Sequence, residues 1–315
     1  MSKTKAFLGI DTSNYTTSVG LCDEGGRVIA NIKRLLDVKE GERGLRQSDA
    51  VFAHVKNFPI LAKEIEQYIT DVEICAIGVS TAPRDVEGSY MPCFLTGVAV
   101  AEMLAATHKA PLYKFSHQSG HIMAALYSCG HLEELIKNDF VAFHVSGGTT
   151  EAVYVSPSEN GFATKIIADT ADISAGQAID RAGVTMGLKF PCGKELESLA
   201  ALNNQKLPKA KICVKDGKCN LSGLENMAKK LYQQTEDKSL VSAFVLDFIG
   251  KTLVALTEEI RDKYPSLPIL YAGGVMSNKL LQNILAGFSD TYFATPDFSA
   301  DNAAGIALLA RRTHK

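Results

Sequence analysis

The chain has 315 residues, of which 46% are hydrophobic and 22% are charged, and this balance excludes an intrinsically disordered protein. Its length predicts about two domains. Lys and Arg number 33 against 35 for Asp and Glu, which excludes attachment to nucleic acid by bulk charge but is compatible with a local basic patch.

The first segment, residues 6–32, predicts a meander of antiparallel strands. Two apolar runs flank a small polar turn at Asp11 to Asn14, and a second turn at Asp23 to Gly26 leads to a third run. The patterns that follow predict a helix, a buried strand and a second helix, at residues 57–70, 74–81 and 95–108.

Residues 140–167 repeat the order of the opening segment. Each copy runs through a strand, a turn of small residues, a Thr-Thr pair, a strand, a glycine turn and a strand, with Thr16-Thr17 matching Thr149-Thr150. A hairpin that recurs in this way indicates an internal duplication. Because the matched positions are few, a chance likeness between two β-meanders is the alternative.

The second half continues with a helix, an apolar strand that ends in Gly-Gly, and a final helix, predicted at residues 239–264, 267–275 and 301–311. Two α/β halves that each open with a hairpin resemble the actin-like ATPase (ASKHA) fold, in which two duplicated α/β domains enclose a central cleft. We therefore expect an N-terminal domain over 1–135 and a C-terminal domain over 136–315. The last helix can pack back on the first domain.

The turns inside the two hairpins are candidate phosphate loops. In Ser146-Gly147-Gly148-Thr149, backbone amides can approach an anion closely because glycine has no side chain, and the hydroxyls add further donors. The matching turn of the first hairpin consists of Asp11, Thr12, Ser13 and Asn14. The alternative for each segment is a plain tight turn. The phosphate interpretation is favoured because, in the expected fold, both hairpins would face one cleft.

A third glycine turn follows the apolar strand of the second half. Gly273 and Gly274 precede a helix that begins near Asn278, so a ligand could approach the backbone beside a helix N-terminus. The alternative is an ordinary strand-to-helix turn with Ser277 or Asn278 as the N-cap, which is the better interpretation of this turn taken alone.

Several polar side chains could carry chemistry. His117 and His121 are one helical turn apart, so both imidazoles can reach a single metal ion, although this spacing is common by chance. Asp301 is a candidate third ligand, with a helix cap as its alternative role. Asp180 is either a ribose-binding carboxylate or part of a solvated helix face. The lysine run from Lys206 to Lys218 can contact phosphates or form a solvated loop.

The seven cysteines are scattered and never spaced as CxxC, which predicts reduced thiols rather than a disulfide framework. The longest apolar stretch, residues 97–106, contains Glu102 and is far shorter than a membrane span. We therefore expect a cytoplasmic protein that does not interact with a membrane.

Taken in order, these motifs resemble the tRNA threonylcarbamoyladenosine transferase family, TsaD, once labelled O-sialoglycoprotein endopeptidase. The likeness covers nearly the whole chain. It runs through GIDTSNYTTSVGL, HQSGHIMAAL, VSGGTTEAVYV, DISAGQAIDRAGVTMGLKFPCGKELE, CNLSGLENMAKKL, AGGVMSNKLL and ADNAAGIALLA. Several ordered motifs are far more specific than any one of them.

The resemblance implies a metal site, a nucleotide site and a reaction. It implies that His117, His121 and Asp301 bind one divalent ion, iron or zinc. The residues that it implies for an adenine nucleotide or acyl-adenylate are Val145, Ser146, Gly147, Gly148, Thr149, Asp180, Gly193 and Asn278. The implied reaction moves a threonylcarbamoyl group from threonylcarbamoyl-AMP to N6 of the tRNA adenine beside the anticodon. The implied partners are tRNA, the small-molecule acyl-adenylate, and protein subunits of the same machinery or a second copy of the chain.

The chain also departs from the family pattern around the expected cleft. The family's residues are replaced at Asn14, Tyr15, Thr16, Thr149, Cys192 and Glu225, and the rim at 84–94 lacks the usual glycine-rich segment. At position 149 a threonine replaces a histidine, and at 225 a glutamate replaces a lysine. Two alternatives to the implied reaction follow: a nucleotide-binding paralogue with a different carbamoyl acceptor, and a non-catalytic regulatory partner subunit.

Overall fold

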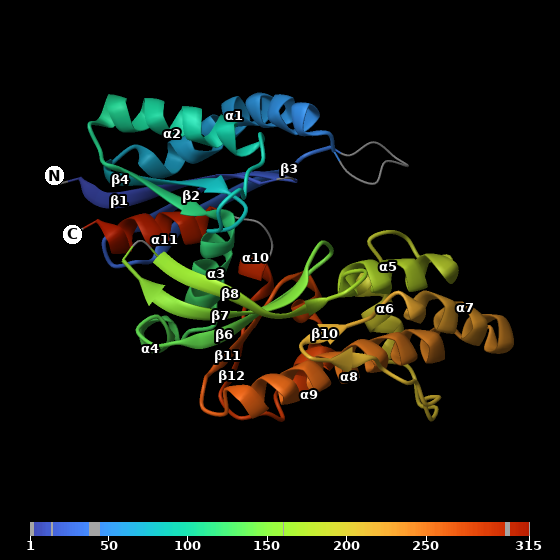
Figure 1. Cartoon of the computed structure of the whole chain (residues 1–315). Coiled ribbons are helices and arrows are strands. Elements are labelled where there is room, and N and C mark those ends of the chain that lie inside the picture. Colours follow the sequence, from blue (N-terminus) through green and yellow to red (C-terminus); the bar gives the residue numbers. More distant parts are fainter. Residues whose placement is uncertain (1–2, 14, 38–44, 160, 300–302, 315) are drawn as a thin grey trace. The chain divides into compact units, whose positions relative to one another are not determined.

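The computed structural model describes residues 3–13, 15–37, 45–159, 161–299 and 303–314. The chain forms two compact α/β units, whose elements are labelled in Figure 1. Unit 1 comprises Met1–Leu132, Pro157–Ala163 and Ala300–Lys315, and unit 2 comprises Glu133–Ser156 and Thr164–Ser299. The first division lies close to the expected one at 135/136, whereas the C-terminal segment groups with unit 1.

Unit 1 is built on a five-stranded sheet in the order β3-β2-β1-β4-β5. Its strands are β1 (Thr4–Thr12), β2 (Thr16–Asp23), β3 (Val28–Leu35), β4 (Val72–Ala82) and β5 (Leu112–Ser116). The first three pair antiparallel, which confirms the predicted meander, and β4 and β5 run parallel to β1. Helices α1 (Gln47–Ile69) and α2 (Phe94–His108) cover one face, and α11 (Ala304–Thr313) covers the other beside α3 (His117–Ser128) (Figure 1).

The C-terminal helix α11 lies directly on the backbone of the central strands. Gly9 of β1 pairs with Gly20 of β2 and with Gly78 of β4, so glycines of neighbouring strands stand side by side. A Cβ atom on Gly9 would lie 2.3 Å from the carbonyl oxygen of Ala303, and one on Gly20 would lie 2.6 Å from it. Larger residues at these positions would push the helix off the sheet, so the glycines hold the end of the chain in unit 1.

Helix α1 is longer than predicted. The expected start near residue 57 followed from apolar residues at helical spacing over 57–70. The helix instead begins at Gln47, and Pro59 lies inside it. Buried side chains that recur along one face account for the extension: Ala50, His54, Leu61 and Ile65.

Unit 2 is built on a seven-stranded sheet in the order β12-β11-β6-β7-β8-β10-β9. Its strands are β6 (Phe140–Val145), β7 (Thr150–Ser158), β8 (Gly161–Thr170), β9 (Val214–Lys215), β10 (Lys218–Cys219), β11 (Ile269–Ala272) and β12 (Thr291–Phe293). Adjacent β6, β7 and β8 form the predicted second meander, and β11 runs parallel to β6. The helices are α4 (Leu132–Leu135), α5 (Ala175–Thr185), α6 (Gly193–Ala200), α7 (Gly223–Thr235), α8 (Lys238–Lys263), η1 (Gly274–Ser277), α9 (Lys279–Leu285) and α10 (Pro296–Ser299).

Helix α8 is the core helix of unit 2. The Asp237 carboxylate caps its start by accepting hydrogen bonds from the amides of Ser239 and Leu240 at 2.8 and 3.1 Å. Its buried face packs beside Tyr271 of β11, whose hydroxyl lies 2.7 Å from that of Thr257. Among the described helices, α8 alone is long and apolar enough to cross a membrane, but 78% of its most apolar window is buried in unit 2. That burial is typical of a core helix.

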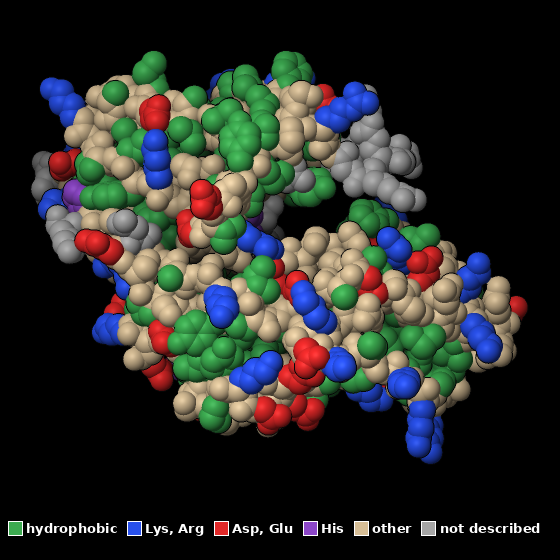
Figure 2. Space-filling model, in the orientation of Figure 1, with side chains coloured by type: hydrophobic (Ala, Val, Ile, Leu, Met, Phe, Trp, Pro, Cys, Tyr) green, Lys and Arg blue, Asp and Glu red, His purple; other side chains and the backbone are tan. Residues whose placement is uncertain are grey.

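The outer faces of α1 and α2 in unit 1 carry exposed apolar side chains. They include Phe52 and Val55 of α1 and Leu95 and Met103 of α2. Figure 2 shows hydrophobic side chains gathered over these two helices. Unit 1 therefore presents an apolar outer surface on this side.

Candidate functional site

The structure brings the two predicted metal-binding histidines together. Helix α3 begins at Ser116, whose hydroxyl accepts a hydrogen bond from the amide of Ser119, and His117 and His121 follow on one face. Their Nε2 atoms lie 2.9 Å apart. Two ring nitrogens that converge in this way are suited to share one metal ion.

A buried carboxylate holds the first histidine. Asp11, at the end of β1, places Oδ1 2.9 Å from Nδ1 of His117, and the Ser80 hydroxyl donates a hydrogen bond to the same oxygen. Because a carboxylate only accepts, this contact requires a hydrogen on Nδ1 of His117, and the neutral ring then presents the lone pair of Nε2. The other oxygen, Oδ2, is buried and has no partner among the described residues. Carboxylates of this kind commonly orient a histidine that binds a metal.

The third predicted ligand, Asp301, lies outside the described residues, as does Asn14 of the first hairpin turn. Within the described part of the chain, no three His, Cys, Asp or Glu side chains gather as a metal site. The remaining side chains of that hairpin turn are buried: Asp11 contacts His117, and the Thr12 hydroxyl accepts a hydrogen bond from the amide of Gly97 at 3.2 Å. The structure therefore gives Asp11 and Thr12 partners inside unit 1, rather than the exposed positions expected of side chains at a phosphate.

The second hairpin turn, Ser146 to Thr149, is fixed against the start of α5. The amide of Gly176 donates to the carbonyl oxygen of Ser146 at 3.1 Å, and the Ser174 hydroxyl donates to that of Gly147 at 2.6 Å. The side chain of Val145, just before the turn, belongs to the buried core of unit 2, so only its backbone can face a ligand. The turn is thus rigidly held before any ligand binds.

The amides of this turn already have an acceptor. Those of Gly148 and Thr149 donate to the Ser146 hydroxyl oxygen at 3.4 and 3.1 Å. Converging amides of this type form a concavity that binds anions, and here the hydroxyl oxygen occupies it. A phosphate would therefore compete with Ser146 for the same donors.

The glycines of unit 2 divide into those that the fold requires and those that it does not. Gly273 has a φ of +103°, and a Cβ atom there would lie 2.3 Å from the carbonyl oxygen of Val145, so close packing of β11 on β6 explains it. By contrast, a Cβ atom would meet nothing within 4 Å at four other predicted site positions: Gly147, Gly148, Gly193 and Gly274. Their own surroundings do not demand glycine, which is the pattern expected where a ligand approaches the backbone.

Asp180 and Gly193 also lie together. The amide of Cys192 donates to Oδ1 of Asp180 at 2.7 Å, which ties α5 to the residue before Gly193. Burial raises the pKa of Asp180, although this hydrogen bond opposes the shift. Asn278 caps α9 by accepting from the amide of Leu281 at 3.1 Å, which matches the N-cap alternative for this residue.

Sequence reasoning missed a titratable pair beside the turn. His144 of β6 stands directly opposite Glu151 of β7 in the antiparallel ladder. The alternation of the strands places both on the face opposite the core residues Phe143 and Ala152. The pair could have been found from the sequence. His144 and Glu151 each interrupt an apolar strand, one on either side of the predicted turn.

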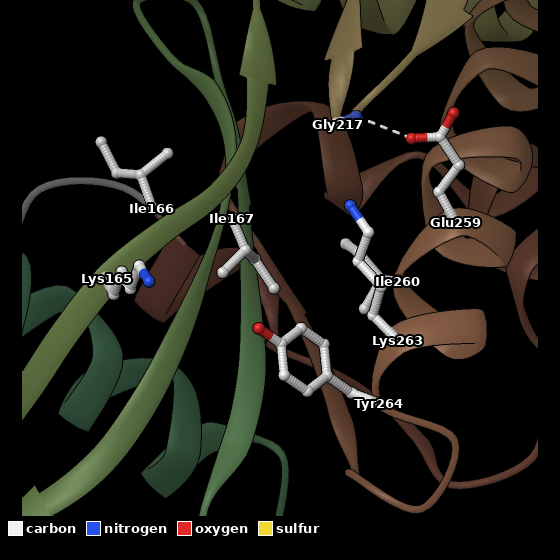
Figure 3. A pocket seen from close by; sticks show the side chains of 8 residues that line it. All are labelled: Lys165, Ile166, Ile167, Gly217, Glu259, Ile260, Lys263 and Tyr264. Atoms are coloured by element: carbon white, nitrogen blue, oxygen red, sulfur yellow. Dashed lines mark hydrogen bonds between the residues drawn. The ribbon is translucent and has the colours of Figure 1, made fainter.

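The predicted basic run is only partly available for phosphates. Lys218 pairs with Asp169, and the neighbouring turn is held by Glu259, whose Oε2 accepts from the amide of Gly217 at 2.7 Å. Beside that turn, a cavity of about 190 Å³ lies between β8 and the end of α8. Figure 3 shows the Tyr264 ring on its wall, pointing toward Ile167. Lys218 and this turn thus serve the packing of unit 2.

Each unit has a sheet that contains an antiparallel meander and is covered by helices. This architecture belongs to the actin-like ATPase fold, as expected from the sequence. Solved structures of this class match nearly the whole chain. HypF in its phosphate- and nucleotide-bound form matches with a TM-score of 0.61 and 12% identity, over 99% of this chain and 56% of that one. Component A of the Acidaminococcus fermentans (R)-2-hydroxyglutaryl-CoA dehydratase matches with a TM-score of 0.58 and 15% identity, over 98% of each chain. At these identities, the likeness shows the fold alone.

The chain belongs to the TsaD family, tRNA N6-adenosine threonylcarbamoyltransferase, whose model matches residues 28–308. A Streptococcus pneumoniae (strain Taiwan19F-14) protein named tRNA N6-adenosine threonylcarbamoyltransferase is 30% identical over 97% of this chain and 91% of its own length. The predicted family is therefore confirmed, and the chain is a member of a family of transferases that act on tRNA.

Proposed function

We propose that this chain is a metal-dependent transferase that moves a threonylcarbamoyl group from threonylcarbamoyl-AMP to N6 of the adenosine beside the anticodon of tRNA. Family membership supports the transfer to tRNA. The observation that carries the metal dependence is the pair of converging imidazoles held by the Asp11 carboxylate.

The chain's own residues fit a divalent ion. His117 and His121 would hold it, with Asp301 as a third ligand, and Asp11 fixes the ring of His117 with Nε2 free of its hydrogen. Two imidazoles and a carboxylate suit iron or zinc. When bound, such an ion would act as a Lewis acid on the oxygen of the transferred acyl group.

Unit 2 would bind the adenylate. Gly147 and Gly148 leave space beside their backbone, and rotation of the Ser146 side chain would release two amides to a phosphate oxygen. Asp180 would contact the ribose with the oxygen that Cys192 does not engage. Gly147 and Gly148 lie just after the end of β6, which runs parallel to β11, and the ends of such strands are the usual ligand-binding edge of an open α/β sheet.

In the proposed transfer, the exocyclic amine attacks the acyl carbon. A nitrogen–carbon bond forms, the bond from that carbon to the phosphate oxygen breaks, and AMP leaves with the electron pair while the amine loses a proton to water. We further propose that the reaction takes place in the cytoplasm, together with partner subunits or a second copy of the chain.

The test measures AMP release from threonylcarbamoyl-AMP, with and without tRNA, together with nucleoside analysis of the tRNA. We expect tRNA-dependent AMP release, loss of bound metal in His117→Ala, and weaker nucleotide binding in Gly148→Val. Gly287→Ala is the matched control, because Gly287 is exposed on unit 2 and its Cβ would only reach ordinary contact with Ile284 at 3.5 Å. A His117→Ala protein that keeps stoichiometric metal would overturn the metal site.

One observation favours a second candidate, a transferase with another acceptor. Glu225 stands where the family pattern has a lysine, and it pairs with Arg181 at 3.6 Å. If the chain restored no modified nucleoside in cells depleted of their own transferase, yet released AMP with another amine, this candidate would replace the first. Nucleotide binding with no turnover would instead support a regulatory subunit.

A further inference from the structure

The segment that follows β4 lies on the start of helix α3 in unit 1. The amide of Gln118 donates to the carbonyl oxygen of Pro83 at 3.0 Å, and the amide of Arg84 donates to the Ser89 hydroxyl at 3.1 Å. This is the segment in which the chain lacks the glycine-rich rim of the family pattern. The side chains that it brings to α3 are therefore features of this chain.

One carboxylate of this segment, that of Asp85, engages both serines at the start of α3. The Ser116 hydroxyl donates to Oδ2 of Asp85 at 2.7 Å, and the Ser119 hydroxyl donates to the same oxygen at 3.0 Å. Both serines are buried, with 1% and 2% of their surface exposed. A charged acceptor binds such hydroxyls about twice as strongly as a neutral one does. Asp85 therefore ties the surface segment to two buried groups.

These contacts act on the N-cap of the helix. The Ser116 hydroxyl oxygen accepts from the amide of Ser119 at 3.1 Å. It lies 2.7 Å from the carboxylate and 3.1 Å from the Ser119 hydroxyl, so its one hydrogen goes to the carboxylate, which is the shorter and charged contact. A negative charge at a helix N-terminus is also favourable to the helix dipole. Asp85 thus fixes the first turn of α3.

That first turn carries the histidine pair. His117 lies between the two serines in the sequence, and His121 follows one helical turn later. Nδ1 of His117 lies 2.9 Å from Oδ1 of Asp11, and its Nε2 lies 2.9 Å from Nε2 of His121. Because the ends of helices open more readily than their middles, these two short distances depend on how firmly the first turn is held.

We propose that Asp85 is a positioning residue for the metal site. Through the hydroxyls of Ser116 and Ser119, its carboxylate holds the first turn of α3 in the orientation that lets the two imidazoles converge. Asp85 acts through the start of the helix and does not itself bind the ion. This inference rests on the proposed function, because it takes His117 and His121 to be metal ligands.

The test measures binding of zinc and of cobalt(II) to the full chain. A competing chelator gives the zinc affinity, and the visible absorption of bound cobalt(II) reports the geometry of its ligands. Loss of a group that orients a ligand directly weakens metal binding by about tenfold to a hundredfold, so Asp85→Ala, which acts one step further away, should weaken zinc binding by about tenfold. The cobalt(II) absorption should change as well, which a loss of stability alone would not cause. Asp85→Asn keeps an oxygen that can accept from both hydroxyls, so it should bind zinc more tightly than Asp85→Ala does.

Glu87→Ala is the matched control, since Glu87 is an exposed carboxylate of the same segment. Ser119→Ala provides a second measurement, because it removes one donor to Asp85 while the Ser116 hydroxyl can still cap the helix. If the two side chains act together, Asp85→Ala should weaken zinc binding less in a Ser119→Ala background than in the unaltered chain. Should Asp85→Ala fail to fold, Ser119→Ala carries the same test, with reduced zinc affinity and an altered cobalt(II) absorption as the expected result.

Unchanged zinc affinity and cobalt(II) absorption in the tested variant, or an equal loss of affinity in Glu87→Ala, would overturn the proposal. In that case, loss of metal binding in His117→Ala would leave the proposed function intact. Metal binding that survives His117→Ala would instead remove the proposed metal site, and the role of Asp85 would be removed with it.

Discussion

Replacing Asp11 with asparagine tests how the metal site is built. The substitution keeps the size of the side chain but removes the charge that faces Nδ1 of His117 across 2.9 Å in a fully buried position. A hydrogen bond to a charged partner contributes about 1.5–3 kcal/mol, which corresponds to about a tenfold to a hundredfold change in a binding constant. Loss of a carboxylate that orients a metal-binding histidine has the same range of effect.

The assay is titration of the metal-free protein with zinc or ferrous ion against a competing chelator. We expect Asp11→Asn to remain folded, because the Ser80 hydroxyl can still donate to the amide oxygen, and to bind the ion about tenfold to a hundredfold more weakly. Glu64→Gln is the control, since Glu64 is a half-exposed carboxylate of unit 1 that pairs with Arg34. Metal affinity that is unchanged in Asp11→Asn, or equally reduced in Glu64→Gln, would refute this reasoning.

Three further predictions concern stability and reactivity. Burial opposes ionisation of Asp172, but hydrogen bonds from the amides of Leu221, Ser222 and Ile173 outweigh it and hold its pKa well below the usual range. Its contribution to stability should be present above about pH 4 and disappear as the pH falls through the folded-state pKa, so urea unfolding of Asp172→Asn should converge with that of the unaltered chain in acid. Burial raises the pKa of Cys93 and Cys192 to about 11, so at pH 8 a thiol reagent should label exposed Cys213 first and reach these two only after denaturation. Tyr271→Phe removes one partner of a buried hydroxyl pair and should lower the free energy of unfolding by about 1 kcal/mol. An unchanged free energy of unfolding would show that the hydrogen bond from Thr257 to the carbonyl oxygen of Leu253 is sufficient for this hydroxyl.

Local sequence patterns predicted most of the elements but left open which domain holds the last helix. Alternating apolar residues and small polar turns specify a hairpin within a few residues, so both meanders form as predicted. The position of α11 depends on glycines at 9, 20 and 78, which become one surface only after three strands pair in register. No window of sequence contains that surface, so the sequence assigned residues 136–315 to one domain and gave the packing of the last helix on the first domain only as an option.

The candidate site shows the same contrast between local and distant contacts. His117 and His121 follow from helical spacing, which is local. The contact of Asp11 with His117 joins residues 106 positions apart, so no local pattern could predict it, and the sequence offered only a phosphate loop or a plain tight turn for this segment. By comparison, the hydrogen bonds of Ser146 to the amides two and three residues later are a common serine turn and could have been predicted.

The reason for a glycine is hard to read from the sequence, whereas the structure shows it directly. Gly273 and Gly274 are neighbours in one motif and look equivalent in the sequence. In the structure, a side chain at 273 would collide with the carbonyl oxygen of Val145, whereas one at 274 would meet nothing. The first glycine is therefore explained by the packing of β11 on β6, whereas the fold leaves open space beside the second. Gly147, Gly148 and Gly193 share this open space, so the fold has room for alanine at each of them. If the proposed ligand covers their backbone, alanine at these positions should reduce ligand binding without reducing stability.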